Sequence, residues 1–175
     1  MGPVFPHSLP LIFPPHMKSY RFGFPAVLAL ALPSCVSYYN LPKDYTGPTA
    51  MIRNTGTAHD AFKSSVFEVA KIEGKLSNAS AMQTPRGGGP VVQMGNSEVK
   101  VPAGQPLQIE LSGHDQFAAD GPALLYAMGG KVAKPAKATL NFTPKANATY
   151  AVKGQLAKEG SSVWMEDTAT GKRVP

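Results

Sequence analysis

The stretch Leu107-Gln108-Ile109-Glu110-Leu111-Ser112 decides the fold class, because apolar and polar side chains alternate along all of it. Alternation with a period of two places Leu107, Ile109 and Leu111 on one face of an extended chain and the polar residues on the other. The chain enters this stretch from Pro102-Ala103-Gly104, a sequence typical of a turn. We therefore expect a half-buried β-strand, whose apolar face has to pack against a second layer.

Outward from this strand, similar patterns recur along most of the chain. The further strand candidates are residues 138–142 and 150–156, and the shorter segments 50–53, 66–72, 99–101 and 163–166. Turn-forming residues separate them at Gly74, Gly104, Gly113, Pro144 and Gly171. About seven short strands with one apolar face each predict an all-β, antiparallel two-sheet sandwich of the immunoglobulin or transthyretin type. A small barrel is the alternative.

The composition agrees with an all-β protein and argues against a nucleic-acid partner. The chain of 175 residues is 43% hydrophobic and 16% charged, which is typical of one globular domain with extra segments. Its 17 Gly and 17 Pro favour many turns over long helices. The formal net charge is +6, but the lysines are scattered singly and form no run that would follow a phosphate backbone. We expect a solvated surface and no nucleic acid among the partners.

The chain from Met17 onward has the order of a secretory signal. Lys18 and Arg21 are followed by eleven uncharged residues, 22–32, and then by small residues. This apolar run is shorter than the about 20 residues that a helix needs to cross a bilayer. The sixteen residues before Met17 hold five prolines and fit no export signal. Residues 1–16 are therefore interpreted as a spurious N-terminal extension and residues 17–34 as a signal peptide.

The signal ends at Leu32-Pro33-Ser34-Cys35, which contains the only cysteine of the chain. These four residues resemble the lipobox of bacterial lipoproteins, which has a Leu three positions before the cysteine and a small residue directly before it. Pro33 departs from the pattern, since that position usually holds Ala, Ser, Thr or Val. The resemblance implies a diacylglyceryl group on the thiol of Cys35, cleavage after Ser34, and acylation of the new amino group.

The residue after the cysteine bears on location. An inner-membrane retention signal of this family would have Asp at this position, where the chain has Val36. The resemblance therefore implies an outer-membrane anchor on Cys35 with the protein facing the periplasm, and an envelope protein or glycan as a further partner. Residues 35–48 carry no charge before Lys43 and predict a flexible tether. Residues 49–175 remain for the sandwich domain.

Candidate chemistry is limited to two His-Asp pairs, His59-Asp60 and His114-Asp115, which hold the only histidines after the signal. Brought together, the two pairs would offer metal ligands. Against this, adjacent residues of a strand point to opposite faces. Adjacent His and Asp residues in a loop also commonly do no more than expose polar groups of a turn to water. The chain has no Gly-x-Ser-x-Gly motif, and Cys35 lies too close to the cleavage site to be a nucleophile. We assign no catalytic residue and no cofactor site.

Three other segments have recognisable local patterns. Residues 77–95 are polar and glycine-rich and predict a mobile loop. Within residues 114–130, the part 118–128 suits a turn of helix or a covering loop at one end of the sandwich. Near the C-terminus, Asp167-x-x-Thr170-Gly171 predicts a turn in which Asp167 bonds backbone amides and Gly171 has a positive φ.

The tether, the Pro-Ala-Gly turn, the strand at Tyr150 and the C-terminal turn together resemble small uncharacterised envelope lipoproteins of proteobacteria. This resemblance implies no activity. Three interpretations follow from the sequence. The first is a lipid-anchored, non-enzymatic periplasmic sandwich with a binding or structural role. The second is an envelope enzyme that uses loop His and Asp residues, and the third is a secreted binding module without lipid.

Overall fold

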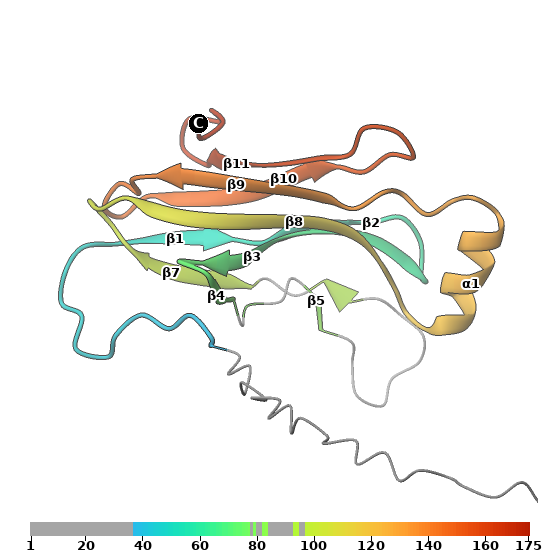
Figure 1. Ribbon diagram of the computed structural model, residues 1–175, viewed down its shortest axis with the longest axis horizontal. Coiled ribbons are helices and arrows are strands. Elements are labelled where there is room, and N and C mark those ends of the chain that lie inside the picture. The colour runs from blue at the N-terminus through green and yellow to red at the C-terminus, as the bar shows by residue number, and fades with distance from the viewer. Residues whose placement is uncertain (1–36, 78, 80–81, 84–92, 95–96) are drawn as a thin grey trace, which may run out of the picture. The chain divides into compact units, whose positions relative to one another are not determined.

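The computed structural model describes residues 37–77, 79, 82–83, 93–94 and 97–175 (Figure 1). The expected signal peptide, Cys35 and most of the glycine-rich segment, including residues 84–92, lie outside the described residues. Among the residues described, no helix combines the length and the apolarity that a membrane span requires.

The described chain forms two packed, mostly antiparallel β-sheets, which confirms the predicted all-β sandwich (Figure 1). In order across the first sheet, the strands are β11 (Ser162–Asp167), β10 (Thr149–Gln155), β1 (Thr49–Arg53) and β7 (Glu98–Pro102). In order across the second, they are β2 (Thr55–Ala58), β3 (Lys63–Ile72), β8 (Leu107–Phe117) and β9 (Ala136–Phe142), with β4 (Lys75–Leu76) paired to β3. The remaining described elements are a short ribbon, β5 (Met82–Gln83) and β6 (Gln93–Met94), and the helix α1 (Asp120–Met128).

The alternating stretch that predicts the fold lies in β8, between β3 and β9. Leu107, Ile109 and Leu111 are buried, with exposed fractions of 6%, 0% and 1%, while Gln108 is exposed. They belong to one hydrophobic core, to which the first sheet contributes Ile52, Val101, Val152 and Met165. Because burying a side chain of this size stabilises folding by about 1.5–3 kcal/mol, these inward positions hold the two sheets together.

All seven predicted strands are present, and β8 continues to Phe117, so that His114 and Asp115 lie in a strand and not in a loop. The segment after it forms the helix α1, at one end of the sandwich (Figure 1). Four short strands of the described residues were not predicted: β2, β4, and the ribbon of β5 and β6, which lies within the segment 77–95 that was expected to be a loop. Among the pairings between labelled strands, one is parallel: β1 lies beside β10, with Met51 opposite Thr149.

The chain passes from the first sheet to the second at Asn54, between β1 and β2. This side chain is 2% exposed. Its Nδ2 donates to the carbonyl of Ala79 at 3.0 Å and to Oγ of Ser97 at 2.9 Å, and its Oδ1 accepts from the amide of Val69 at 2.9 Å. Asn54 therefore satisfies its own polar atoms and a strand amide at a point where the ladder is interrupted.

The segment before β1 is joined to the domain from its first described residue. The carbonyl of Ser37 accepts a hydrogen bond from the amide of Leu76 at 2.9 Å, and the amide of Tyr39 donates to the carbonyl of Leu76 at 2.8 Å. Tyr39 packs against the core, and burial raises the pKa of its phenol. Residues 37–39 thus lie beside β4.

The C-terminal turn has the conformation that its sequence predicts. Oδ1 of Asp167 accepts hydrogen bonds from the amides of Ala169 at 2.9 Å and Thr170 at 3.3 Å. Gly171 has a φ of +67°, in the left-handed region that favours glycine. The chain then returns along β11, where Glu166 and Arg173 form an isolated bridge.

Candidate functional site

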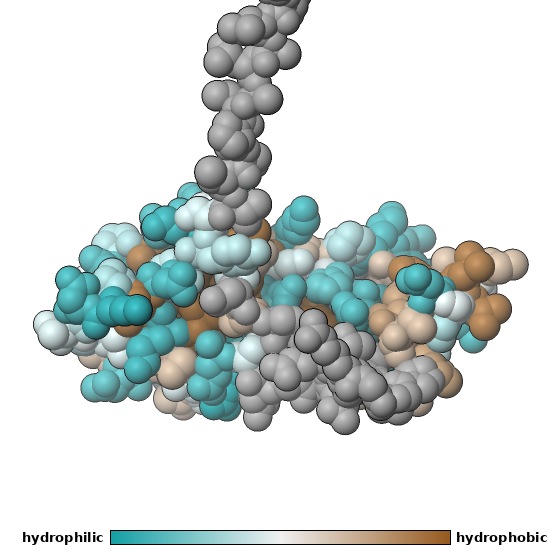
Figure 2. Space-filling view, turned by 90° about the horizontal axis from the view of Figure 1, so that it is seen from below, coloured by the Kyte–Doolittle hydropathy of each residue, from teal (hydrophilic) through white to brown (hydrophobic). Residues whose placement is uncertain are grey.

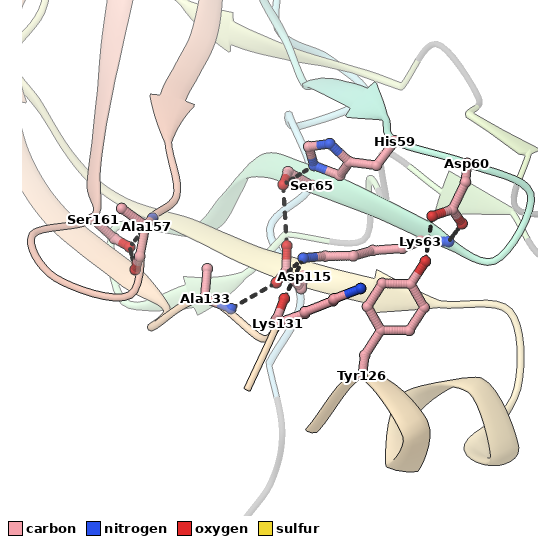
Figure 3. A network of polar contacts seen from close by, with 10 residues as sticks. All are labelled: His59, Asp60, Lys63, Ser65, Asp115, Tyr126, Lys131, Ala133, Ala157 and Ser161. Atoms are coloured by element: carbon pink, nitrogen blue, oxygen red, sulfur yellow. Dashed lines mark hydrogen bonds and ion pairs between the residues drawn. The ribbon is translucent and has the colours of Figure 1, made fainter. Parts of the chain in front are cut away.

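Asp115 is the centre of a buried polar network near α1 (Figure 3). Its side chain is 2% exposed, and its Oδ2 lies 2.9 Å from Nζ of Lys63. The same oxygen accepts a hydrogen bond from the amide of Ala133 at 2.8 Å, while Oδ1 accepts one from Oγ of Ser65 at 3.1 Å. Register explains part of this arrangement, because Ser65 of β3 lies directly opposite Asp115 of β8.

Lys63 connects this network to the segment around α1. Its ammonium group donates to the carbonyl of Lys131 at 2.8 Å and lies 5.6 Å from the centre of the Tyr126 ring. Tyr126 also packs on Phe117, with ring centres 5.5 Å apart. No residue of α1 is buried, so contacts made through Tyr126 take the place of an apolar face in holding this helix.

His59 completes the network through Ser65, with Nε2 2.8 Å from Oγ. Asp115 is paired with a lysine and so accepts hydrogen bonds only, which means that the Ser65 hydroxyl donates to Asp115. The same hydroxyl then accepts from Nε2 of His59, so Nε2 carries a proton. The serine lies between the histidine and the carboxylate, whereas in a serine-hydrolase triad the histidine takes that position and removes the serine proton.

Asp60 binds its own turn and α1. Oδ1 accepts from the amides of Phe62 at 2.8 Å and Lys63 at 3.0 Å, and Oδ2 accepts from the hydroxyl of Tyr126. The hydrogen bond from Tyr126, followed by the one from the Phe62 amide, lowers the pKa of Asp60 below its ordinary value. The same carboxylate raises the pKa of the Tyr126 phenol.

The structure brings together three of the four residues considered as metal ligands: His59, Asp60 and Asp115 belong to one network. His114 precedes Asp115 in β8 and therefore points to the other face of the sheet. In the described part of the chain, no three His, Cys, Asp or Glu side chains are grouped so that they could hold a metal ion. The atoms of Asp115 are already engaged by an ammonium group, a hydroxyl and an amide. Through these contacts Asp115 links β3, β8 and the segment after α1, which is a structural role.

The sequence did not point to Lys63, which forms the ion pair with Asp115, or to Ser65, which connects His59 to Asp115. It also missed a pocket of about 530 Å³ between the β9–β10 connection and the C-terminal segment. The pocket is lined, among others, by Phe142, Lys145, Tyr150, Asp167, Lys172 and Arg173. These residues come from segments that are separated in the sequence, so no local motif marks them.

A third feature is an apolar surface on α1. Leu124, Leu125 and Met128 are exposed by 62%, 71% and 78%. Figure 2 shows hydrophobic side chains gathered at the end of the domain that carries α1. Met128 follows Leu125 by three residues and Leu124 by four, spacings that place Met128 beside both leucines on the helix surface.

Comparison of the chain with protein-family models, with curated proteins and with solved structures finds no match. The function is therefore argued from the residues of this chain.

Proposed function

We propose that the protein is a lipid-anchored domain of the bacterial cell envelope, held on the outer membrane by acyl chains on Cys35 and facing the periplasm, where it acts by binding and not by catalysis. The lipobox-like Leu32-Pro33-Ser34-Cys35, the basic start and the uncharged run before it support the anchor. A single acyl chain binds a membrane marginally, whereas the chains that lipobox processing adds would hold the protein stably.

The observation that carries this proposal is the lipobox-like Leu32-Pro33-Ser34-Cys35, which follows a basic start and an uncharged run and precedes all strands of the sandwich, the first of which begins at Thr49. Cleavage after Ser34 would leave the whole sandwich in the mature protein. A leader that is removed there takes no part of the sheets with it.

The hydrogen bond from the Leu76 amide of β4 to the Ser37 carbonyl limits how far the lipid can lie from the domain. Only Val36 lies between Ser37 and the acylated cysteine, and consecutive Cα atoms lie about 3.8 Å apart. The lipid is thus attached within roughly 8 Å of the first residue that is bonded to the domain. The anchored domain would lie close to the bilayer surface, with the edge at Leu76 nearest to the lipid.

The polar network supports a role in binding over a role in catalysis. Ser65, the one hydroxyl near a histidine in this network, is 5% exposed and donates its proton to Asp115. Its hydroxyl therefore lacks both the free approach and the base that a nucleophile needs. Replacement of His59 by Gln should leave any envelope function intact.

The test of the anchor is the intact mass of the protein from cells fed labelled palmitate. The wild type should lose all residues before Cys35 and gain labelled lipid, whereas Cys35→Ser should do neither. Ser37→Ala is the matched control, because it removes a neighbouring side chain and should be processed like the wild type. An unmodified thiol on Cys35 in the wild type would overturn the anchor and favour the secreted module.

A second variant tests the location. Val36→Asp places the retention residue directly after the lipidated cysteine, so the variant should move from the outer to the inner membrane in a density gradient. Val36→Asn, which is uncharged and similar in size to Asp, is its control. Recovery of the wild type in the inner-membrane fraction would contradict the outer-membrane assignment and leave lipidation itself in place.

A further inference from the structure

We propose that the pocket between the β9–β10 connection and the C-terminal segment is a binding site for a small ligand with a carboxylate or phosphate group. Its volume of about 530 Å³ lies in the range of sites for small molecules. This inference goes beyond the proposed membrane anchor and does not depend on it, since the pocket is built only from the sandwich and the chain after β11.

The charge of the lining favours an anion. Lys145, Lys172 and Arg173 line the pocket, and Asp167 is the only acidic side chain among the lining residues. The Asp167 carboxylate already accepts hydrogen bonds from two amides of its own turn. Lys145 and Lys172 form no ion pair with any residue in the described ranges, whose ion pairs lie elsewhere. The ammonium groups of these two lysines are therefore left for a ligand.

Arg173 is held in place by an aromatic ring. Its guanidinium carbon lies 3.9 Å from the centre of the Trp164 ring. Neither Trp164 nor Glu166 lines the pocket. Glu166 pairs with Arg173 in the bridge beside β11, and the hydrogen bonds from Lys153 and Trp164 lower the pKa of its carboxyl group, with the charge of Arg173 as a smaller cause in the same direction. The guanidinium is therefore not counted among the groups that would meet the ligand, and the two lysines carry the proposal.

Part of the pocket lining is fixed before any ligand arrives. Phe142 and Tyr150 pack edge to face, with ring centres 5.2 Å apart, and both are buried. The hydroxyl of Tyr150 accepts a hydrogen bond from the amide of Lys145 at 3.0 Å. The backbone that carries Lys145 is thereby held by the core, which reduces the ordering that binding would otherwise require.

The part of the lining after β11 is held by hydrogen bonds to that strand. The amide of Val174 donates to the carbonyl of Met165 at 2.8 Å, and the amide of Asp167 donates to the carbonyl of Lys172 at 3.0 Å. These bonds fix the backbone on both sides of Arg173. Lys145 and Lys172 are therefore carried by backbone that is held in place, while their ammonium groups can adjust to the ligand.

The ligand class can be tested with three sugars of similar size on the full-length chain in nonionic detergent. Glucuronate presents a carboxylate, glucose 6-phosphate presents a phosphate, and glucose is the neutral control. We expect isothermal titration to show binding of at least one anionic sugar and none of glucose. Binding of glucuronate alone would identify a carboxylate site, and binding of glucose 6-phosphate alone a phosphate site.

Variants connect the binding to this pocket. Lys145→Gln and Lys172→Gln should each weaken binding of the anion about tenfold, because each removes one charge-assisted contact. Lys75→Gln in β4 removes the same charge from an exposed site outside the pocket and is the matched control. Circular dichroism of each variant checks that the fold is retained.

Two results would overturn the proposal. One is the absence of binding of both anionic sugars at concentrations up to about 10 mM, well above the dissociation constant of a weak specific site. The other is an equal loss of affinity in Lys172→Gln and Lys75→Gln, which would assign the binding to overall charge. Neither result would bear on lipidation of Cys35, which is measured by mass.

Discussion

The carboxylate of Asp115 and the ammonium group of Lys63 form a buried ion pair, 2.9 Å apart, with side-chain exposures of only 2% and 13%. A second ion pair, between Nζ of Lys71 and Oε2 of Glu110, has a similar separation of 3.0 Å, but its side chains are 38% and 37% exposed. The two pairs join the same strands, β3 and β8, and differ mainly in their access to water. They provide a matched comparison of what burial does to an ion pair.

Lys63→Met should lower the free energy of unfolding by about 3–5 kcal/mol, because it leaves the charge of Asp115 buried without a partner. Lys71→Met, at the exposed pair, should cost only about 0–1 kcal/mol. Urea unfolding followed by circular dichroism measures both. Equal losses in the two variants would show that Asp115 is better solvated than its surroundings indicate.

Gly154→Ala should destabilise the domain by about 1–3 kcal/mol through overpacking. A Cβ atom at this position would overlap the ring of Phe67 and would lie 2.6 Å from the carbonyl oxygen of Ser162. Gly121→Ala in α1 is the control, since its Cβ would meet no atom within 4 Å. A helix gains up to about 1 kcal/mol from this change, so the control should be neutral or stabilising. Thermal unfolding of the two variants compares them directly.

Tyr126→Phe should raise the pKa of Asp60 towards its ordinary value, since the Tyr126 hydroxyl is the largest cause of its lowered pKa. A lowered pKa in the folded state adds stability at neutral pH that is lost as the pH falls through the acidic range. The variant should therefore lose less stability on acidification than the wild type. Carboxyl NMR titration measures the pKa, and Tyr45→Phe, which removes a hydroxyl elsewhere, should leave it unchanged.

Asn54→Ala should cost about 2–4 kcal/mol, because it leaves the buried amide of Val69 and the carbonyl of Ala79 without their partner. Asn141→Ala removes an exposed amide side chain from β9 and should change stability by less than about 0.5 kcal/mol. Chemical unfolding again measures the difference. A small effect at Asn54 would mean that water replaces the lost side chain between β1 and β2.

The strands were predictable because burial on one face leaves a period of two in the sequence, as in Leu107, Ile109 and Leu111. The strand β2 was not, since Thr-Gly-Thr-Ala has no large apolar residue and none of its residues is buried. Its hydrogen bonds to β3 form because the chain turns at Asn54. Backbone pairing of this kind depends on neighbours in space, and the local sequence does not record it.

The polar network was predictable in part, for a related reason. The His-Asp pairs are visible as titratable residues, but their partners are set by register. Ser65 lies opposite Asp115 only because β3 and β8 pair as they do over ten and eleven residues. The basic pocket depends in the same way on the return of the chain after Gly171 to the end of β9.

The parallel pairing of β1 with β10 imposes an order on folding. Met51 and its partner Thr149 lie about 100 residues apart in the sequence. The strand β1 therefore cannot pair with β10 until most of the domain has been synthesised. During synthesis, β1 can pair with β7, but the first sheet cannot close until β10 has left the ribosome. A chain threaded through a translocation channel from its N-terminus would thus remain without its complete first sheet until almost all of it had crossed. The strand order of the first sheet would thus also keep a chain from completing its fold before translocation is nearly finished.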